Sequence, residues 1–116
     1  MNIIFETDDI QKMKEKYIVL PLDTFRFPNN KIATAHCVVD KFPLDMIAKM
    51  DNYIKLHCDM VNGYKTRQWN FCIQALDNLI GSFGGELDTY YINIKNRVSG
   101  FLKEEPPENW TYIIQK

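Results

Sequence analysis

The sequence lacks the motifs that most often reveal a nucleotide, zinc or calcium site. Neither GxxxxGK nor GxGxxG, the two common glycine-rich phosphate-binding patterns, occurs anywhere in the chain. The cysteines show no CxxC spacing, and there is no DxDxDG calcium-binding loop. No apolar run approaches the roughly 20 residues that a membrane-spanning helix needs. The sequence therefore predicts no resident cofactor, no metal and no membrane contact.

An excess of charge of either sign is also missing. The chain has 14 lysines and arginines against 15 aspartates and glutamates, for a net charge of −1. General nucleic-acid-binding proteins usually concentrate basic residues on one face, so this function is not expected. The first residues, MNIIFETDD, reach acidic side chains after one short apolar run, which does not fit a secretory signal. An odd, sparse set of three cysteines then predicts a cytoplasmic protein with free thiols.

What is present suffices for one domain over residues 1–116. A chain of 116 residues buries about two thirds of its unfolded surface, and 46% of these residues are hydrophobic. Period-two patterns and turn residues predict strands at 2–6, 17–27, 32–39 and 110–115, a helix at 9–16 that Asp8 would cap, and a turn at 27–31. Pro21 lies inside the second strand, so that strand is expected at a sheet edge or bulged.

From Pro43 onward the apolar period changes from two to about 3.6, which predicts three consecutive amphipathic helices. Their apolar faces comprise Ile47, Met50, Ile54, His57, Cys58 and Val61; then Trp69, Cys72, Ile73, Leu76, Leu79, Ile80 and Phe83; then Leu87, Tyr90, Tyr91, Ile94, Val98, Phe101 and Leu102. The predicted fold is α+β: a small, mostly antiparallel sheet of N-terminal strands, a hairpin and a C-terminal strand packs against the three helices.

The stretch GSFGGELDTYY, residues 81–91, is the nearest approach to a phosphate-binding loop. Glu86 and Asp88 lie in the first turn of the following helix, where their charge complements the helix dipole and would repel phosphate. We therefore interpret the glycine pair as a corner between helices, with Gly84 as a left-handed cap, Gly85 allowing the turn and Asp88 capping the next helix.

Two His-Cys dipeptides, His36-Cys37 and His57-Cys58, together with Cys72, raise the alternatives of a zinc site and of a cysteine nucleophile. Neighbouring residues point to opposite faces of a strand and lie about 100° apart on a helix, so neither dipeptide holds one ion easily. His57 lies in the middle of an apolar helix face, which is typical of a buried, neutral, hydrogen-bonded histidine. A small enzyme built on a His/Cys pair stays open as an alternative.

Several large side chains fall outside the apolar helix faces or beside basic residues. The first group predicts an interface for self-association or for a protein partner, because a monomer rarely leaves such a surface open. It consists of Leu56, Met60, Phe71 and Ile92. The second group predicts, as an alternative, a site where a small nucleotide-like ligand stacks and pairs with positive charge. It consists of Trp69, Tyr90, Tyr91 and Arg97.

In its overall character, though in no single motif, the chain resembles the small accessory proteins of tailed bacteriophages. It shares their short length, the absence of cofactor and catalytic signatures, and a helical surface that is half covered. The resemblance implies a viral protein in the cytoplasm of a host cell that binds and inhibits a host enzyme or defence component, or sequesters a small signalling molecule. The leading hypothesis is a non-enzymatic, oligomeric interaction protein.

Overall fold

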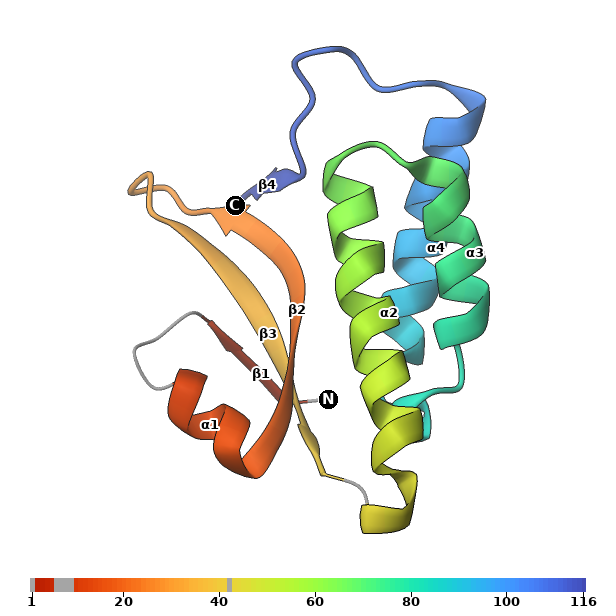
Figure 1. Cartoon of the computed structure of the whole chain (residues 1–116). Helices are drawn as coiled ribbons and strands as arrows, with labels where there is room; N and C mark the ends of the chain where they lie inside the picture. The colour runs from red at the N-terminus through yellow and green to blue at the C-terminus, as the bar shows by residue number, and fades with distance from the viewer. Residues whose placement is uncertain (1, 6–9, 42) are drawn as a thin grey trace.

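The computed structural model describes residues 2–5, 10–41 and 43–116, and Figure 1 shows their arrangement. Four strands, four α-helices and two short 3-10 turns follow one another along these residues. In chain order they are β1 (Asn2–Phe5), α1 (Ile10–Lys16), β2 (Tyr17–Arg26), β3 (Ile32–Asp40), the turn Leu44–Met46, α2 (Ile47–Lys65), α3 (Trp69–Leu79), the turn Phe83–Gly85, α4 (Asp88–Lys103) and β4 (Ile113–Gln115). The Asp8 cap and the expected start of the first helix at residue 9 lie outside the described residues.

The sheet has the strand order β1-β3-β2-β4, with β3 antiparallel to both of its neighbours and β4 parallel to β2. The β2–β3 hairpin turns as expected: Asn30 takes a left-handed φ of 66°, and its N–H donates to the Phe27 carbonyl at 2.8 Å. The predicted α+β class, with a small and mostly antiparallel sheet against three consecutive helices, is confirmed.

Both expectations for Pro21 are confirmed, because β2 is bulged and is also an edge strand over half its length. Pro21 pairs with His36, but Thr24 pairs with Thr34, so β2 has one extra residue between these positions. The parallel strand β4 pairs with β2 only from Thr24 to Arg26. From Tyr17 to Pro21, β2 therefore has a strand on one side only, that of β3, among the residues that the structure describes.

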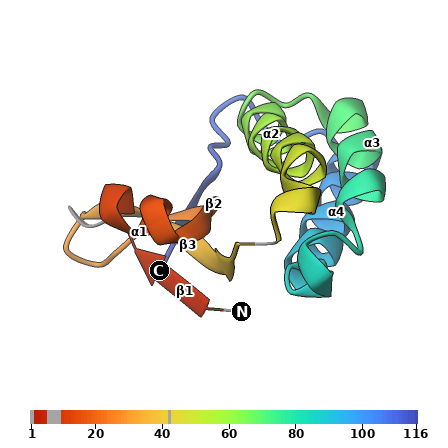
Figure 2. The same cartoon turned by 60° about the horizontal axis from the view of Figure 1, so that its bottom comes forward.

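Sheet and helices form two parts that meet along β2 (Figure 2). The helices α2, α3 and α4 group together, whereas α1 lies with the sheet. The core between the two parts comprises Ile18, Leu20 and Leu22 of β2, Ala35, Cys37 and Val39 of β3, and apolar side chains of α2, α3 and α4, among them Met60, Leu76, Leu79, Tyr91, Ile94 and Val98. The first α2 residue that belongs to this core is Met50, so the expected core position of Ile47, which is 45% exposed, is wrong.

The glycine-rich stretch is a helix corner, as predicted, but the helix ends earlier than expected. Helix α3 stops at Leu79, and Gly81 is the first left-handed residue after it, with a φ of 92°. The Asp88 carboxylate accepts a hydrogen bond from the Gly81 N–H at 2.8 Å, which ties the start of α4 to the corner. The Gly81 N–H, which a bound anion would need as a donor, therefore already donates to a carboxylate.

The C-terminal segment returns from the end of α4 to the sheet along the outside of the molecule (Figure 1). Arg67, between α2 and α3, donates to the carbonyl of Pro106 at 3.0 Å and also to that of Pro107. Trp110 packs edge-on against Tyr64 and Trp69, with ring centroids 5.6 Å apart in each pair. These contacts hold the segment in place so that β4 can add to β2.

Candidate functional site

A large cavity lies along the part of β2 that, among the described residues, has no second neighbouring strand. This edge groove has a volume of about 730 Å³, within the range of roughly 300–1,000 Å³ that is usual for binding sites. One wall is the β2 edge from Tyr17 to Pro21, and the other is the first half of α2 with the turn that precedes it. The apolar side chains of that second wall include Leu44, Ile47 and Ile54.

The groove follows from the way β2 and α2 separate. The two elements touch where His57 of α2 reaches Pro21 of β2, and they diverge toward the start of α2 (Figure 1). Ile47 and Ile54 are seven residues apart, so they lie on one stripe of the helix and both face the groove. Leu44, Ile47 and Tyr17 keep 85%, 45% and 37% of their surface exposed. This uncovered apolar surface is concentrated in one concave place.

Polar groups lie among these apolar side chains. Lys14 of α1, Lys41 and Asp51 line the groove, and the Lys41 ammonium also donates to the Glu15 carbonyl at 2.8 Å. His36 shares the groove, and its Nδ1 lies 3.1 Å from the Thr34 carbonyl. Because a carbonyl only accepts, that nitrogen carries the proton. Two lysines and one aspartate give the groove a small positive balance.

His57 bonds to the backbone of Pro21, one of the residues that line the groove. It is fully buried, its Nε2–H donates to the Pro21 carbonyl at 2.6 Å, and its Nδ1 accepts from the Tyr91 hydroxyl at 2.8 Å. Burial lowers the pKa of His57 to about 4, although the bond to Pro21 acts in the opposite direction. The expectation of a buried, neutral, hydrogen-bonded histidine is confirmed, and this histidine joins β2, α2 and α4.

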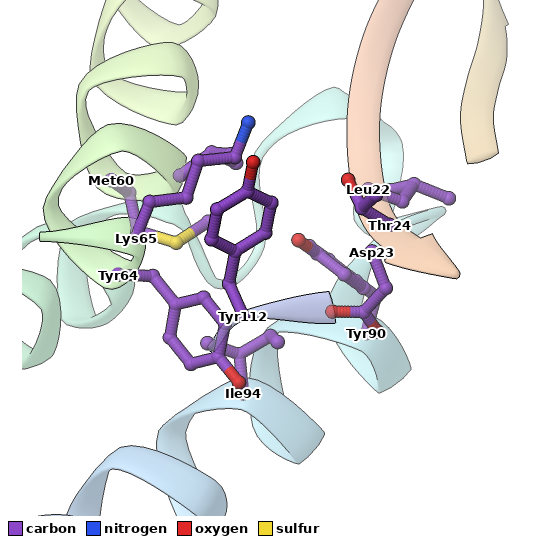
Figure 3. Close-up of a pocket in the computed structure, with 10 residues that line it drawn as sticks. Leu22, Asp23, Thr24, Met60, Tyr64, Lys65, Tyr90, Ile94 and Tyr112 are labelled. Carbon is purple, nitrogen blue, oxygen red and sulfur yellow. The ribbon is translucent and has the colours of Figure 1, made fainter. Parts of the chain in front are cut away.

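A second, much smaller cleft is lined by one of the four residues predicted to bind a small ligand, Tyr90, and a second one, Arg97, bonds to two residues of its lining. Arg97 donates from its two Nη atoms to the Asp23 carboxylate at 3.1 and 3.4 Å and also reaches the Tyr64 hydroxyl at 3.3 Å. Tyr90 lines the cleft beside Asp23, opposite Tyr64 and Tyr112 (Figure 3). The cleft has a volume of about 10 Å³, which is room for one water molecule at most.

The other two predicted ligand-binding residues lie in the core, away from this cleft. Trp69 is 5% exposed, stacks on Phe101 with centroids 4.9 Å apart, and donates from its indole N–H to Glu105 at 3.1 Å. Tyr91 is fully buried behind His57. The predicted set therefore does not line one open cavity, because its aromatic rings fill the spaces between packed helices.

The predicted interface residues are also divided. Met60 is fully buried, so its expected place on an exposed flank is wrong: at this position of α2 it lies in the lining of the small cleft, together with Leu22 of β2 and Ile94 of α4. Leu56 is half-buried against the core. Phe71 and Ile92 are 39% and 47% exposed. The Phe71 ring nevertheless packs on Gly63 so closely that a Cβ added to Gly63 would lie 2.9 Å from the ring. An interface through Phe71 and Ile92 stays a prediction.

The cysteines do not form an activated site. Burial raises the pKa of the Cys37 and Cys72 thiols to about 11, and burial followed by the nearby Asp59 carboxylate raises that of Cys58. Among the described residues no three histidine, cysteine or acidic side chains come together as metal ligands. Thiols with raised pKa values are held protonated, which is the reverse of what a nucleophile needs.

We expect these three thiols to differ in reactivity. Cys58 is half-buried and lines the edge groove, whereas Cys37 and Cys72 are fully buried. Iodoacetamide at pH 8 is expected to modify Cys58 first and to reach the other two only when the chain unfolds, about tenfold or more slowly. Intact-mass and peptide analysis over time measures this. Equal rates at all three cysteines in the folded protein would contradict the burial of Cys37 and Cys72.

Comparison with protein-family models, with curated proteins and with solved structures gives no match for this chain. In the part of the chain that the structure describes, no helix combines the length and the apolar character that crossing a bilayer requires. The groove residues Tyr17, Val19, Leu44 and Ile47 were not singled out as site residues in the sequence analysis. The one sequence signal that pointed toward them was Pro21, which marked β2 as an edge strand.

Proposed function

We propose that the protein is a non-enzymatic interaction protein that binds another protein through the edge groove and thereby modulates or inhibits it. The observation that carries this proposal is the gathering of exposed apolar side chains in one groove, with Leu44 85% and Ile47 45% exposed. Apolar surface concentrated in a concave place is typical of interaction sites. A partner from a host cell is what the resemblance to bacteriophage accessory proteins implies, and this stays a prediction, as does self-association.

The two alternatives have less support from the geometry. A small nucleotide-like ligand would have to displace the Asp23–Arg97 ion pair, since the cleft beside it has a volume of only about 10 Å³. An enzyme based on a His/Cys pair would need a reactive thiolate, but burial raises the pKa of both Cys37 and Cys72 to about 11. The edge groove, in contrast, is large and apolar enough for a segment of a protein partner.

The test compares two isoleucines of nearly equal exposure. Ile47, 45% exposed, lies in the groove at the start of α2, and Ile92, 47% exposed, lies on α4 outside it. Ile47→Glu is expected to weaken partner binding by about tenfold or more, because it places a charge on an apolar wall. The fold should tolerate this change, since a glutamate in the first turn complements the helix dipole. Ile92→Glu is expected to bind as the wild type does.

The measurement is affinity capture from cells of the protein's own source with the wild type and each variant as bait, followed by titration of the purified partner. Thermal midpoints of the two variants serve as the control for folding. A partner lost by Ile92→Glu and kept by Ile47→Glu would contradict the groove and place the interface on the helical surface expected from the sequence.

A further inference from the structure

Among the described residues, the backbone of β2 beside the edge groove pairs with a strand on one side only. Pairing with β3 runs without interruption from Tyr17 opposite Asp40 to Pro21 opposite His36. In an antiparallel pair, residues alternate: one directs its N–H and C=O at the partner strand, and the next directs both away from it. The Pro21 carbonyl accepts from His57 of α2, so Pro21 is one of the residues that face away from β3.

Counting back by two from Pro21 identifies the other groups that face the groove. Val19 and Tyr17 have the same parity as Pro21, so their N–H and C=O groups also point away from β3, while Ile18 and Leu20 pair with it. Tyr17, Val19 and Pro21 all line the groove. In the described part of the chain, no other strand pairs with this stretch of the edge, because β4 pairs with β2 only from Thr24 to Arg26.

The edge also has a defined end. Pro21 has no N–H to donate, and its carbonyl is already used by His57 at 2.6 Å. A hydrogen-bonding ladder along this edge must therefore stop before Pro21 and is limited to Val19 and Tyr17. Beyond the bulge, β4 occupies the same edge from Thr24 onward. Strand β4 thus covers one half of this edge, and the described residues include no strand along the other half.

We propose that the edge groove binds an extended segment of the partner protein, which adds to β2 as a further strand; this inference rests on the proposed function. The segment pairs with the N–H and C=O groups of Val19 and with the C=O of Tyr17, whose N–H closes the last turn of α1; this allows about three backbone hydrogen bonds. The open edge, Tyr17 to Pro21, is about 16 Å long at 3.3 Å per residue, which matches a segment of about five residues.

The groove favours a strand over a helix as its occupant. A helix has its backbone groups already paired and a diameter of about 10–12 Å, so it would cover the groups of Val19 without bonding to them. An extended segment satisfies these groups and directs alternate side chains toward the apolar stripe of Ile47 and Ile54 on α2. Lys14 and Lys41 outnumber Asp51 in the groove, so the segment should combine alternating apolar residues with an acidic one.

The experiment uses a displayed library of random heptapeptides selected on the wild-type protein. Enriched sequences are expected to repeat apolar residues with a period of two; apolar residues at i, i+3 and i+4 would overturn strand addition. Val19→Pro removes the outward N–H without removing a bond to β3, and Pro21 shows that a proline fits this register. We expect Val19→Pro to weaken binding of an enriched peptide about tenfold or more, and Val19→Ala, which keeps the N–H, to weaken it less.

Methylating the amides of the peptide one at a time tests the same ladder with the protein unchanged, even if Val19→Pro does not fold. We expect methylation to weaken peptide binding at alternate positions only. A loss of affinity that does not alternate along the peptide would overturn strand addition. Ile47→Glu separates the two proposals. If it abolishes peptide binding while Val19→Pro does not, the groove is the site but the strand ladder is wrong. If neither variant weakens binding, the proposed function fails as well. A wild-type dimer in light scattering that Val19→Pro converts to a monomer would assign the added strand to a second copy and overturn the partner segment.

Discussion

Replacing His57 by leucine is expected to lower the free energy of unfolding by about 2–5 kcal/mol. Leucine fills a similar volume but bonds to neither partner, so the Pro21 carbonyl and the Tyr91 hydroxyl lose the bonds of 2.6 and 2.8 Å that they make with the imidazole. Each buried polar group left without a partner costs about 1–3 kcal/mol. Urea unfolding followed by tryptophan fluorescence measures the loss, which is large for a domain whose total stability is about 5–15 kcal/mol.

A double-mutant cycle shows whether this cost arises from the network. Tyr91→Phe alone leaves the Nδ1 of His57 without its donor and should destabilise the chain by about 1–2 kcal/mol. When His57→Leu is already present, the same change removes a hydroxyl that no longer bonds to His57, so it should cost less. Strictly additive effects of the two changes would contradict the hydrogen bond between them.

Acidification between pH 6.5 and pH 4 is expected to destabilise the protein by about 3 kcal/mol in total through His57. Burial lowers the pKa of this histidine from its ordinary 6.5 to about 4 in the folded chain. Between these two values the unfolded chain binds a proton that the folded chain does not. The contribution of the neutral His57 to the free energy of unfolding is therefore complete above pH 6.5. It falls by about 1.4 kcal/mol per pH unit as the pH decreases to 4.

His57→Gln provides the control for this pH dependence. Glutamine does not titrate, and its amide N–H groups can still donate to the Pro21 carbonyl. Urea unfolding at several pH values from 4 to 7.5 gives the free energy of unfolding as a function of pH. The slope of this free energy against pH should be steep for the wild type and much smaller for His57→Gln. All other ionisable groups are the same in both proteins, so the difference between the two slopes reports on His57. Equal slopes would contradict a buried, neutral His57.

Patterns that act over a few residues predicted most of the elements. The change of apolar period at Pro43 identified α2, α3 and α4, because a helix and a strand place their side chains with periods of 3.6 and 2. Proline inside a strand predicted both the bulge and the edge position of β2, since proline cannot donate to a ladder. His57 was correctly expected to be buried and neutral, because it lies in the middle of an apolar helix face.

The predictions of which helix residues are buried were wrong where burial depends on a segment that is distant in the sequence. Ile47, Ile54 and Val61 lie seven residues apart and look alike in the sequence, yet the sheet covers Val61 and leaves Ile47 45% exposed. Met60 fell outside the predicted face but is buried, because Leu22 of β2 and Ile94 of α4 reach it. The periodicity of a helix says which side is apolar and not how far along that side another element extends.

The sequence by itself determined the α+β class, the order of the helices, the edge character of β2 and the environment of His57. Only the tertiary structure decided that α2 and β2 separate to form the edge groove, and that Asp23 meets Arg97 although the two are 74 positions apart in the sequence. Local patterns fix the conformation of each segment, whereas a groove or an ion pair depends on the relative placement of segments that are far apart in the chain.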